Sequence, residues 1–233
     1  MSENATEVAE KRRELFAYTL PFAAFLLLTA IEGKFGDQKG LYATLYVGKI
    51  AVLSTILILT RRAWPAFRWN GVLLGTGAGI VGVAAWILLA KIDLLGLFPE
   101  SIRGWLGGQR VGLEPTGLKE PFRSDFIALR LFGLAIVVPL MEELFWRGFL
   151  MRYLISEDFN RVPIGTYTRN SFVIVTLLFT AVHPEILAAL VWGAAINLLL
   201  YRTKNLWACV AMHATTNALL GVYILATDSW QLW

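Results

Sequence analysis

Residues 70–90 read NGVLLGTGAGIVGVAAWILLA and contain no charged side chain. At a rise of about 1.5 Å per residue, a helix of this length crosses a hydrocarbon core about 30 Å thick. The segment is apolar on all sides, whereas a strand of an outer-membrane barrel would alternate apolar and polar residues. This stretch therefore predicts a membrane-spanning helix and argues against a barrel.

The composition of the whole chain agrees with this prediction. Of 233 residues, 57% are hydrophobic and only 16% are charged, and the mean hydropathy is +0.59. Soluble chains carry about 25% charged residues, so we expect lipid to cover much of this surface. Stretches poor in charge predict spans at 15–31, 41–60, 70–90, 126–141, 171–183, 186–201 and 205–227.

These stretches predict an all-α fold: a polytopic helical integral membrane protein with about seven or eight transmembrane helices. The stretches 171–183 and 186–201 are short for a span, and an additional amphipathic helix could lie within 142–160 or 91–124. The composition shifts near residue 124, after which polar residues within apolar stretches become frequent. We therefore divide the chain into N-terminal helices with a connecting loop (1–124), a core (125–222) and a C-terminal tail (223–233).

Lysine and arginine are distributed unevenly among the predicted loops. Four clusters fall on one side if the seven spans alternate: Lys11, Arg12 and Arg13; Arg61, Arg62 and Arg68; Arg147, Arg152, Arg161 and Arg169; Arg202 and Lys204. The opposite segments, 32–40 and 91–125, balance bases with acids. Because cytoplasmic loops are enriched in Lys and Arg, we expect a cytoplasmic N-terminus. The net charge of +4 is thus a topology signal, and no pattern of basic and aromatic residues indicates nucleic acid binding.

Several polar or small residues in apolar stretches have structural explanations. Lys49 and Arg130 lie near span ends, where their charges can reach the interface. Asn197 can hydrogen-bond between helices. The single cysteine, Cys209, excludes an intramolecular disulfide and a cysteine-ligated metal site. A row of small residues typical of close helix packing is formed by Gly71, Gly75 and Gly79.

Two adjacent carboxylates and an arginine occur in the segment PLMEELFWR, residues 139–147. An ionisable residue at membrane depth costs about 2.5–3.5 kcal/mol on insertion and usually faces a polar cavity. Residues four apart share a helix face, so Glu143 can pair with Arg147 while Glu142 points about 100° away. One arginine compensates only one of the two charges. The pattern therefore predicts that Glu143 is neutralised and that Glu142 is free.

The two histidines of the chain both lie in apolar stretches. Pro184 breaks the helix after His183 and leaves backbone carbonyls free nearby. His213 and Asn217 are four residues apart and share one face of the last span. A lone buried histidine is usually a hydrogen-bonded core residue. A free carboxylate, two imidazoles and an amide together supply what peptide hydrolysis needs, a base for water and donors for an oxyanion.

Three motifs in this order resemble those of the CPBP family of intramembrane proteases, the type II CAAX prenyl endopeptidases and their bacterial relatives. They are Glu142-Glu143-x-x-x-Arg147, Phe179-x-x-x-His183 and His213-x-x-x-Asn217, and the resemblance covers about residues 125–222. The run MEELFWR and the short chain are also similar to the CAAX-protease-related proteins of bacterial exosortase systems.

The resemblance implies a catalytic cavity inside the helical bundle of a bacterial cytoplasmic membrane protein. It implies hydrolysis near the C-terminus of a membrane-associated or prenylated protein or peptide. Glu142 matches the general base, His183 a residue that positions or polarises the water, and His213 with Asn217 the pair that stabilises the oxyanion. Glu143 and Arg147 match positions that are better explained as structural, and Phe179 matches an aromatic residue that packs against the site. In the family the cavity opens toward the cytoplasm, and we expect that access here.

The site is compatible with two mechanisms. In the first, Glu142 alone activates water, and no cofactor is needed. In the second, Glu142, His183 and His213 bind zinc, because two histidines and one carboxylate with an open position form a known catalytic zinc set. The H-E-x-x-H helix of common zinc proteases is absent, and the resemblance favours the metal-free version.

Two other classes of function would also keep a polar cavity. One is a non-catalytic membrane scaffold, immunity or regulatory protein. The other is a proton-coupled transporter, which would use Glu and His as a relay, although the sequence has no inverted repeat and no matching pair of broken helices. A transporter predicts similar losses for Glu142→Gln and Glu143→Gln, whereas a protease predicts that Glu142→Gln is far worse.

Overall fold

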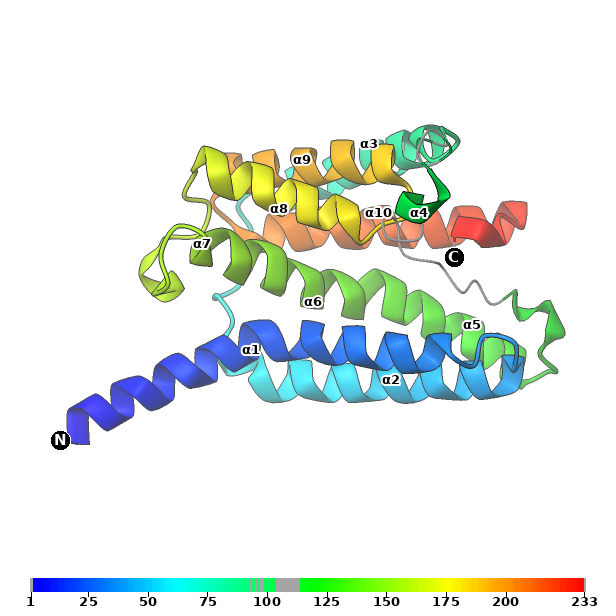
Figure 1. The fold of residues 1–233 in the computed structure, drawn as a ribbon, viewed down its shortest axis with the longest axis horizontal. Coiled ribbons are helices and arrows are strands. Elements are labelled where there is room, and N and C mark those ends of the chain that lie inside the picture. Colours follow the sequence, from blue (N-terminus) through cyan, green and yellow to red (C-terminus); the bar gives the residue numbers. More distant parts are fainter. Residues whose placement is uncertain (1, 93, 95, 97–98, 104–113, 233) are drawn as a thin grey trace.

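The computed structural model describes residues 2–232 except 93, 95, 97, 98 and 104–113. The described residues form helices and turns without β-strands, so the predicted all-α, polytopic helical membrane fold is confirmed. Neighbouring helices run back and forth along one long axis (Figure 1). They are α1 (Ser2–Gly33), α2 (Lys39–Thr60), α3 (Val72–Leu89), a long helix over Phe122–Tyr153, α8 (Arg169–Ala181), α9 (Ile186–Thr203) and α10 (Leu206–Thr227).

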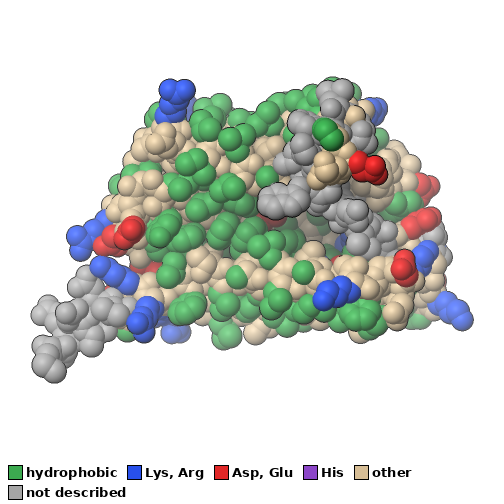
Figure 2. Space-filling model, viewed as in Figure 1, with side chains coloured by type: hydrophobic (Ala, Val, Ile, Leu, Met, Phe, Trp, Pro, Cys, Tyr) green, Lys and Arg blue, Asp and Glu red, His purple; other side chains and the backbone are tan. Residues whose placement is uncertain are grey.

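Six helices of the described part are long and apolar enough to cross a membrane. They comprise Ala9–Gly33, Lys39–Ala63, Val72–Leu89, Phe122–Tyr153, Ile186–Thr203 and Leu206–Thr227. The seventh predicted span, 171–183, corresponds to α8, whose 13 residues extend only about 20 Å at 1.5 Å per residue. Hydrophobic side chains cover the face seen in Figure 2, and charged side chains lie mainly toward the two ends.

The long helix changes its hydrogen-bond pattern twice. The α-helical segments α5 (Phe122–Phe132), α6 (Val138–Glu143) and α7 (Met151–Tyr153) are separated by the π-helical segments η4 (Gly133–Val137) and η5 (Leu144–Leu150). A π-helical turn bonds each carbonyl one residue further along the chain, and such turns are frequent at functional sites. Glu142 and Glu143 end α6, so both carboxylates lie between the two π-helical segments.

Helix α3 packs against α10 through its row of glycines, as the sequence predicts. A Cβ added at Gly75 would lie 2.1 Å from the carbonyl oxygen of Ala208, and one at Gly79 would lie 2.6 Å from that of Met212. The two backbones approach this closely because glycine has no side chain at the contact.

Replacing Gly75 by leucine is expected to lower the thermal stability of the detergent-solubilised protein. The new side chain would force α3 away from α10, and overpacking of this kind typically costs about 1–3 kcal/mol or more. Gly77→Leu is the matched control, because a Cβ at Gly77 meets nothing within 4 Å. Equal melting temperatures for the two variants would contradict the packing role of Gly75.

The turns of the bundle lie at two ends with different charge. At the end called the basic end here, the chain turns from α2 to α3 through η1 (Arg61–Ala63), from α7 to α8 through η6 (Phe159–Arg161), and from α9 to α10 (Figure 1). The clusters that begin at Lys11, Arg61, Arg152 and Arg202 lie along this end. Arg147 was counted with them, but it is fully buried inside the bundle.

The opposite end holds the turn between α1 and α2 and the C-terminal turn η7 (Trp230–Leu232), whereas the short α8 turns into α9 before reaching this end (Figure 1). The connection from α3 to α5 also lies there and contains α4 (Glu100–Arg103) and η3 (Pro115–Gly117). Part of the predicted 91–125 loop lies outside the described residues.

Candidate active site

A cavity of about 400 Å³ runs from the middle of the bundle toward the end opposite the basic end. All four residues predicted to be catalytic line it: Glu142, His183, His213 and Asn217. Phe179 lines it as well. These residues come from three helices: Glu142 from the long helix, Phe179 and His183 from α8 or its end, and His213 and Asn217 from α10. The fold thus brings together groups that the sequence separates.

Glu142 lies one residue before the end of α6 and is 7% exposed. Within the described part of the chain, its Oε2 atom has no hydrogen-bond partner. A buried carboxylate oxygen without a partner carries a desolvation cost that water or a substrate group can relieve. Because Glu142 lines the cavity, it is placed to bind such a group.

Glu143 points away from Glu142 into a buried network. Its Oε1 accepts hydrogen bonds from Arg147 Nη1 at 3.0 Å and from His213 Nδ1 at 2.8 Å. Arg147 Nε donates to Asn197 Oδ1 at 3.0 Å, and Asn197 Nδ2 donates to Thr176 Oγ1 at 3.0 Å. Glu143 and Arg147 are both 0% exposed. The ion pair expected from the four-residue spacing is therefore present, as is the interhelical role of Asn197.

The contact with His213 gives Glu143 a role that the sequence does not reveal. An ionised carboxylate only accepts hydrogen bonds, so the proton at this contact belongs to His213 Nδ1. This contact fixes the orientation of the His213 ring and leaves Nε2 as its second polar atom. The Trp192 ring packs against it at 4.8 Å between ring centroids. When Nε2 also carries a proton, His213 can donate a hydrogen bond from it into the cavity. Glu143 is thus a positioning residue for His213.

His183 is oriented by the break at the end of α8. The helix ends at Ala181, and the His183 amide donates to the carbonyl of Thr180 at 3.1 Å. The carbonyl of Phe179 is left for the imidazole of His183, whose Nδ1 lies 2.7 Å from it. A carbonyl acceptor places the proton on Nδ1 and leaves Nε2 as an acceptor. Pro184 thus acts as predicted, by freeing a carbonyl that fixes the histidine.

Asn217 is tied to the first π-helical segment. Its Nδ2 donates to the carbonyl of Leu134 in η4 at 3.0 Å. The amide group has two N–H bonds, so one remains as a donor at the cavity wall. Phe179 packs against both halves of the site, because its ring lies 4.3 Å from the His183 ring and 4.9 Å from Arg147 Cζ.

Residues 124–219 match the family model described as type II CAAX prenyl endopeptidase Rce1-like. The chain carries an Rce1-like domain. The match confirms the resemblance to CPBP proteases and includes every residue of the three motifs. No curated protein and no solved structure matches the chain.

The zinc alternative requires three side chains of the Rce1-like domain to surround one metal ion. In the part of the chain that the structure describes, no three His, Cys, Asp or Glu side chains are grouped so that they could hold one metal ion. Glu142, His183 and His213 share the cavity, and chelation followed by addition of zinc tests whether they bind the ion.

The cavity of the Rce1-like domain lies on an unexpected side of the bundle. It is lined by Gly33 and Tyr42 at the end where α1 ends and α2 begins, which is opposite the basic end. The expectation that the cavity and the basic clusters share one side is therefore wrong. The functional side chains face the end opposite the basic end.

Lys49 and Arg130 also differ from expectation. We expected both to extend their charges to the membrane surface, but they are only 5% and 9% exposed and line the cavity of the Rce1-like domain. Residues from α1 and α2, outside the matched segment, thus complete the wall of this cavity.

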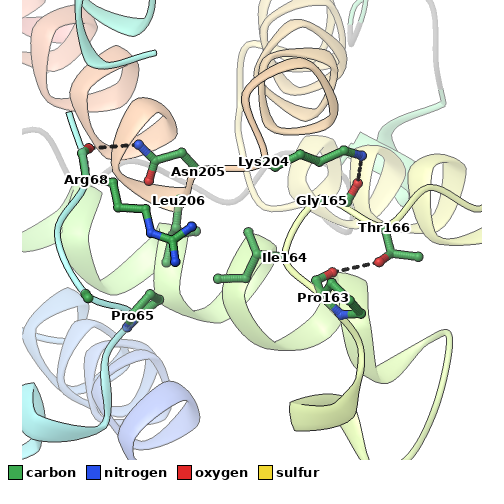
Figure 3. A pocket seen from close by; sticks show the side chains of 10 residues that line it. Pro65, Arg68, Pro163, Ile164, Gly165, Thr166, Lys204, Asn205 and Leu206 are labelled. Atoms are coloured by element: carbon green, nitrogen blue, oxygen red, sulfur yellow. Dashed lines mark hydrogen bonds between the residues drawn. The ribbon is translucent and has the colours of Figure 1, made fainter. Parts of the chain in front are cut away.

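A second cavity, of about 590 Å³, lies at the basic end, away from every predicted site residue of the Rce1-like domain (Figure 3). The side chains of Thr166, Lys204 and Asn205 in its wall are bonded to backbone carbonyls. Asn205 Nδ2 donates to the carbonyl of Arg68 at 2.9 Å, and Lys204 Nζ donates to that of Gly165. These bonds join three turns, so this cavity is a junction in the scaffold.

Proposed function

We propose that this protein is an intramembrane endopeptidase that hydrolyses a peptide bond near the C-terminus of a membrane-associated or prenylated protein or peptide. The observation that carries the proposal is the unpartnered Oε2 of Glu142 in a cavity shared with His183, His213 and Asn217. The Rce1-like family supports a protease of the CAAX type, and the apolar helices place it in a lipid bilayer.

In the proposed mechanism, Glu142 takes a proton from a water molecule that His183 Nε2 helps to hold. The resulting hydroxide attacks the carbonyl carbon of the substrate and forms a tetrahedral intermediate. His213 Nε2 and the second N–H of Asn217 donate hydrogen bonds to the oxyanion. In other hydrolases, removal of one such donor lowers kcat by about 100- to 1000-fold. Glu142 then returns its proton to the amine nitrogen as the carbon–nitrogen bond breaks.

The proposal is tested by cleavage of a quenched peptide in liposomes, with and without a farnesylated cysteine. We expect the wild-type protein to cleave at least one of the two peptides and to keep its activity after exhaustive chelation. Loss of activity on chelation, with recovery on addition of zinc, would contradict the metal-free mechanism. Cleavage of neither peptide would favour a non-catalytic scaffold.

We also propose that the N-terminus is cytoplasmic in a bacterial cytoplasmic membrane, because the basic end carries the excess of Lys and Arg. The cavity then faces the opposite side of the membrane, and the substrate reaches it from there. This direction of access follows from the positions of the cavity and the basic clusters within one bundle.

This orientation predicts the labelling of single cysteines in intact cells. The buried Cys209 is first replaced by alanine, and one cysteine is then introduced at the exposed Gln38 or the exposed Glu157. A membrane-impermeant maleimide is expected to label Gln38→Cys and to leave Glu157→Cys unlabelled until the cells are opened. The reverse pattern would place the cavity on the cytoplasmic side.

A further inference from the structure

The cavity at the basic end has a positively charged wall. Of the described residues that line it, two are basic, Arg68 and Lys204, and none is acidic. Lys204 Nζ donates one of its three N–H bonds to a neutral carbonyl, that of Gly165, so this bond leaves its charge uncompensated. Two positive charges therefore face one space of about 590 Å³.

Arg68 has a guanidinium that the scaffold does not use. The bond that holds this position runs from Asn205 Nδ2 to the backbone carbonyl of Arg68. Within the described residues, no hydrogen bond, ion pair or ring contact involves the Arg68 side chain. Figure 3 shows this side chain extending from its own turn toward Ile164, in the turn between η6 and α8. A guanidinium that faces a cavity in this way can bind an anion through two parallel hydrogen bonds.

Exposed aromatic rings place this cavity at the level of lipid headgroups. Phe67 and Trp69, on either side of Arg68, are 52% and 74% exposed. Tyr167, next to the cavity wall in the neighbouring turn, is 59% exposed. Tryptophan and tyrosine are enriched at the interface between membrane and water. Leu73, about one turn further along α3, is 84% exposed, so the lipid-facing surface begins directly beside the cavity.

We propose that Arg68 and Lys204 bind the phosphate of an anionic phospholipid in the leaflet at the basic end. The phosphate oxygens accept hydrogen bonds from the guanidinium and from the remaining N–H bonds of Lys204. Basic pockets between helices on the cytoplasmic side of membrane proteins bind anionic headgroups, and the basic end is cytoplasmic in the orientation proposed above. A bound headgroup joins the turn before α3 to the turn before α10. This site does not depend on the proposed endopeptidase.

Native mass spectrometry of the full chain in neutral detergent tests the site. The dissociation constant of the first bound lipid is measured for dioctanoyl phosphatidylglycerol and for dioctanoyl phosphatidylcholine, which has a phosphate but no net charge. We expect phosphatidylglycerol to bind at least tenfold more tightly. Arg68→Gln is expected to reduce this preference to twofold or less, because one base near an anionic lipid contributes a factor of about five.

Arg62→Gln is the matched control, because Arg62 is exposed at the same end but does not line the cavity. This variant should keep the full preference. Ala66→Glu, which adds an acid at an exposed position of the cavity wall, should lose it as Arg68→Gln does. Without added lipid, both cavity variants should melt at the wild-type temperature, since the scaffold bond uses only the backbone of Arg68.

Three results would overturn the lipid site. The first is equal binding of the two lipids, or an unchanged preference in the cavity variants. The second is an equal loss in Arg62→Gln, which would assign the preference to the basic surface as a whole. The third is displacement of phosphatidylglycerol by an equal concentration of inorganic phosphate, which would assign the cavity to free phosphate. Because no cleavage is measured, failure of the endopeptidase would leave each of these results unchanged.

Discussion

Glu142→Gln is expected to lower the rate of peptide cleavage by about 100- to 10,000-fold, the usual contribution of a general base. Glutamine keeps the shape of the side chain but cannot take a proton from water. Thermal stability should change little or rise, because the substitution removes a buried carboxylate whose Oε2 has no partner among the described residues. The liposome assay measures the rate, and thermal unfolding in detergent measures the stability.

The matched control is Glu157→Gln, at an exposed carboxylate in the turn after α7. This variant should cleave at the wild-type rate, since Glu157 does not line the cavity. If Glu142→Gln kept more than a tenth of the wild-type rate, Glu142 would not be the base, and the water would have to be activated by another group.

Glu143→Gln should produce the largest loss of stability. It leaves the guanidinium of Arg147 fully buried without a compensating charge, and removing one partner of a buried ion pair costs about 3–5 kcal/mol. For a chain of this size that corresponds to a fall of about 10 °C in the melting temperature. Cleavage should also fall, because His213 loses the carboxylate that orients it.

A charge-matched double variant separates these two effects. Replacing both Glu143 and Arg147 by glutamine should restore part of the stability, because no uncompensated charge is left. It should not restore cleavage, because the carboxylate on His213 is still missing. If Glu142→Gln and Glu143→Gln caused equal and mild losses, the protease would be contradicted and the charge balance of a proton-coupled transporter would be favoured.

Local spacing allowed part of the site to be predicted from the sequence. Glu143 and Arg147 are four residues apart on one helix, so their contact follows from helical geometry alone. Pro184 likewise predicts a freed carbonyl near His183. The end of α8 was less predictable, because the apolar run continues through Val182 and His183 although the helix ends at Ala181. Hydropathy records the apolar character of that run and does not register the helix end.

Contacts between distant segments could not be predicted in this way. His213 and Glu143 are 70 residues apart, and only the packing of α10 against α6 brings them within 2.8 Å. The direction of Lys49 and Arg130 was also inaccessible, since a charge near a span end can reach either the lipid interface or an internal cavity. Which end of the bundle the cavity reaches depends on the tilt and packing of all the helices together.

The buried network of Glu143 and Arg147 has a consequence for biosynthesis. As the helix over Phe122–Tyr153 leaves the ribosome, it brings three ionisable residues, Glu142, Glu143 and Arg147, into the membrane. Their combined insertion cost is of the order of 8–10 kcal/mol. Two partners in the network, Asn197 and His213, are made later, in α9 and α10. A chain truncated before α9 should therefore be inserted poorly or degraded by quality-control proteases. Stable insertion of Glu142, Glu143 and Arg147 thus requires helices that are synthesised after them.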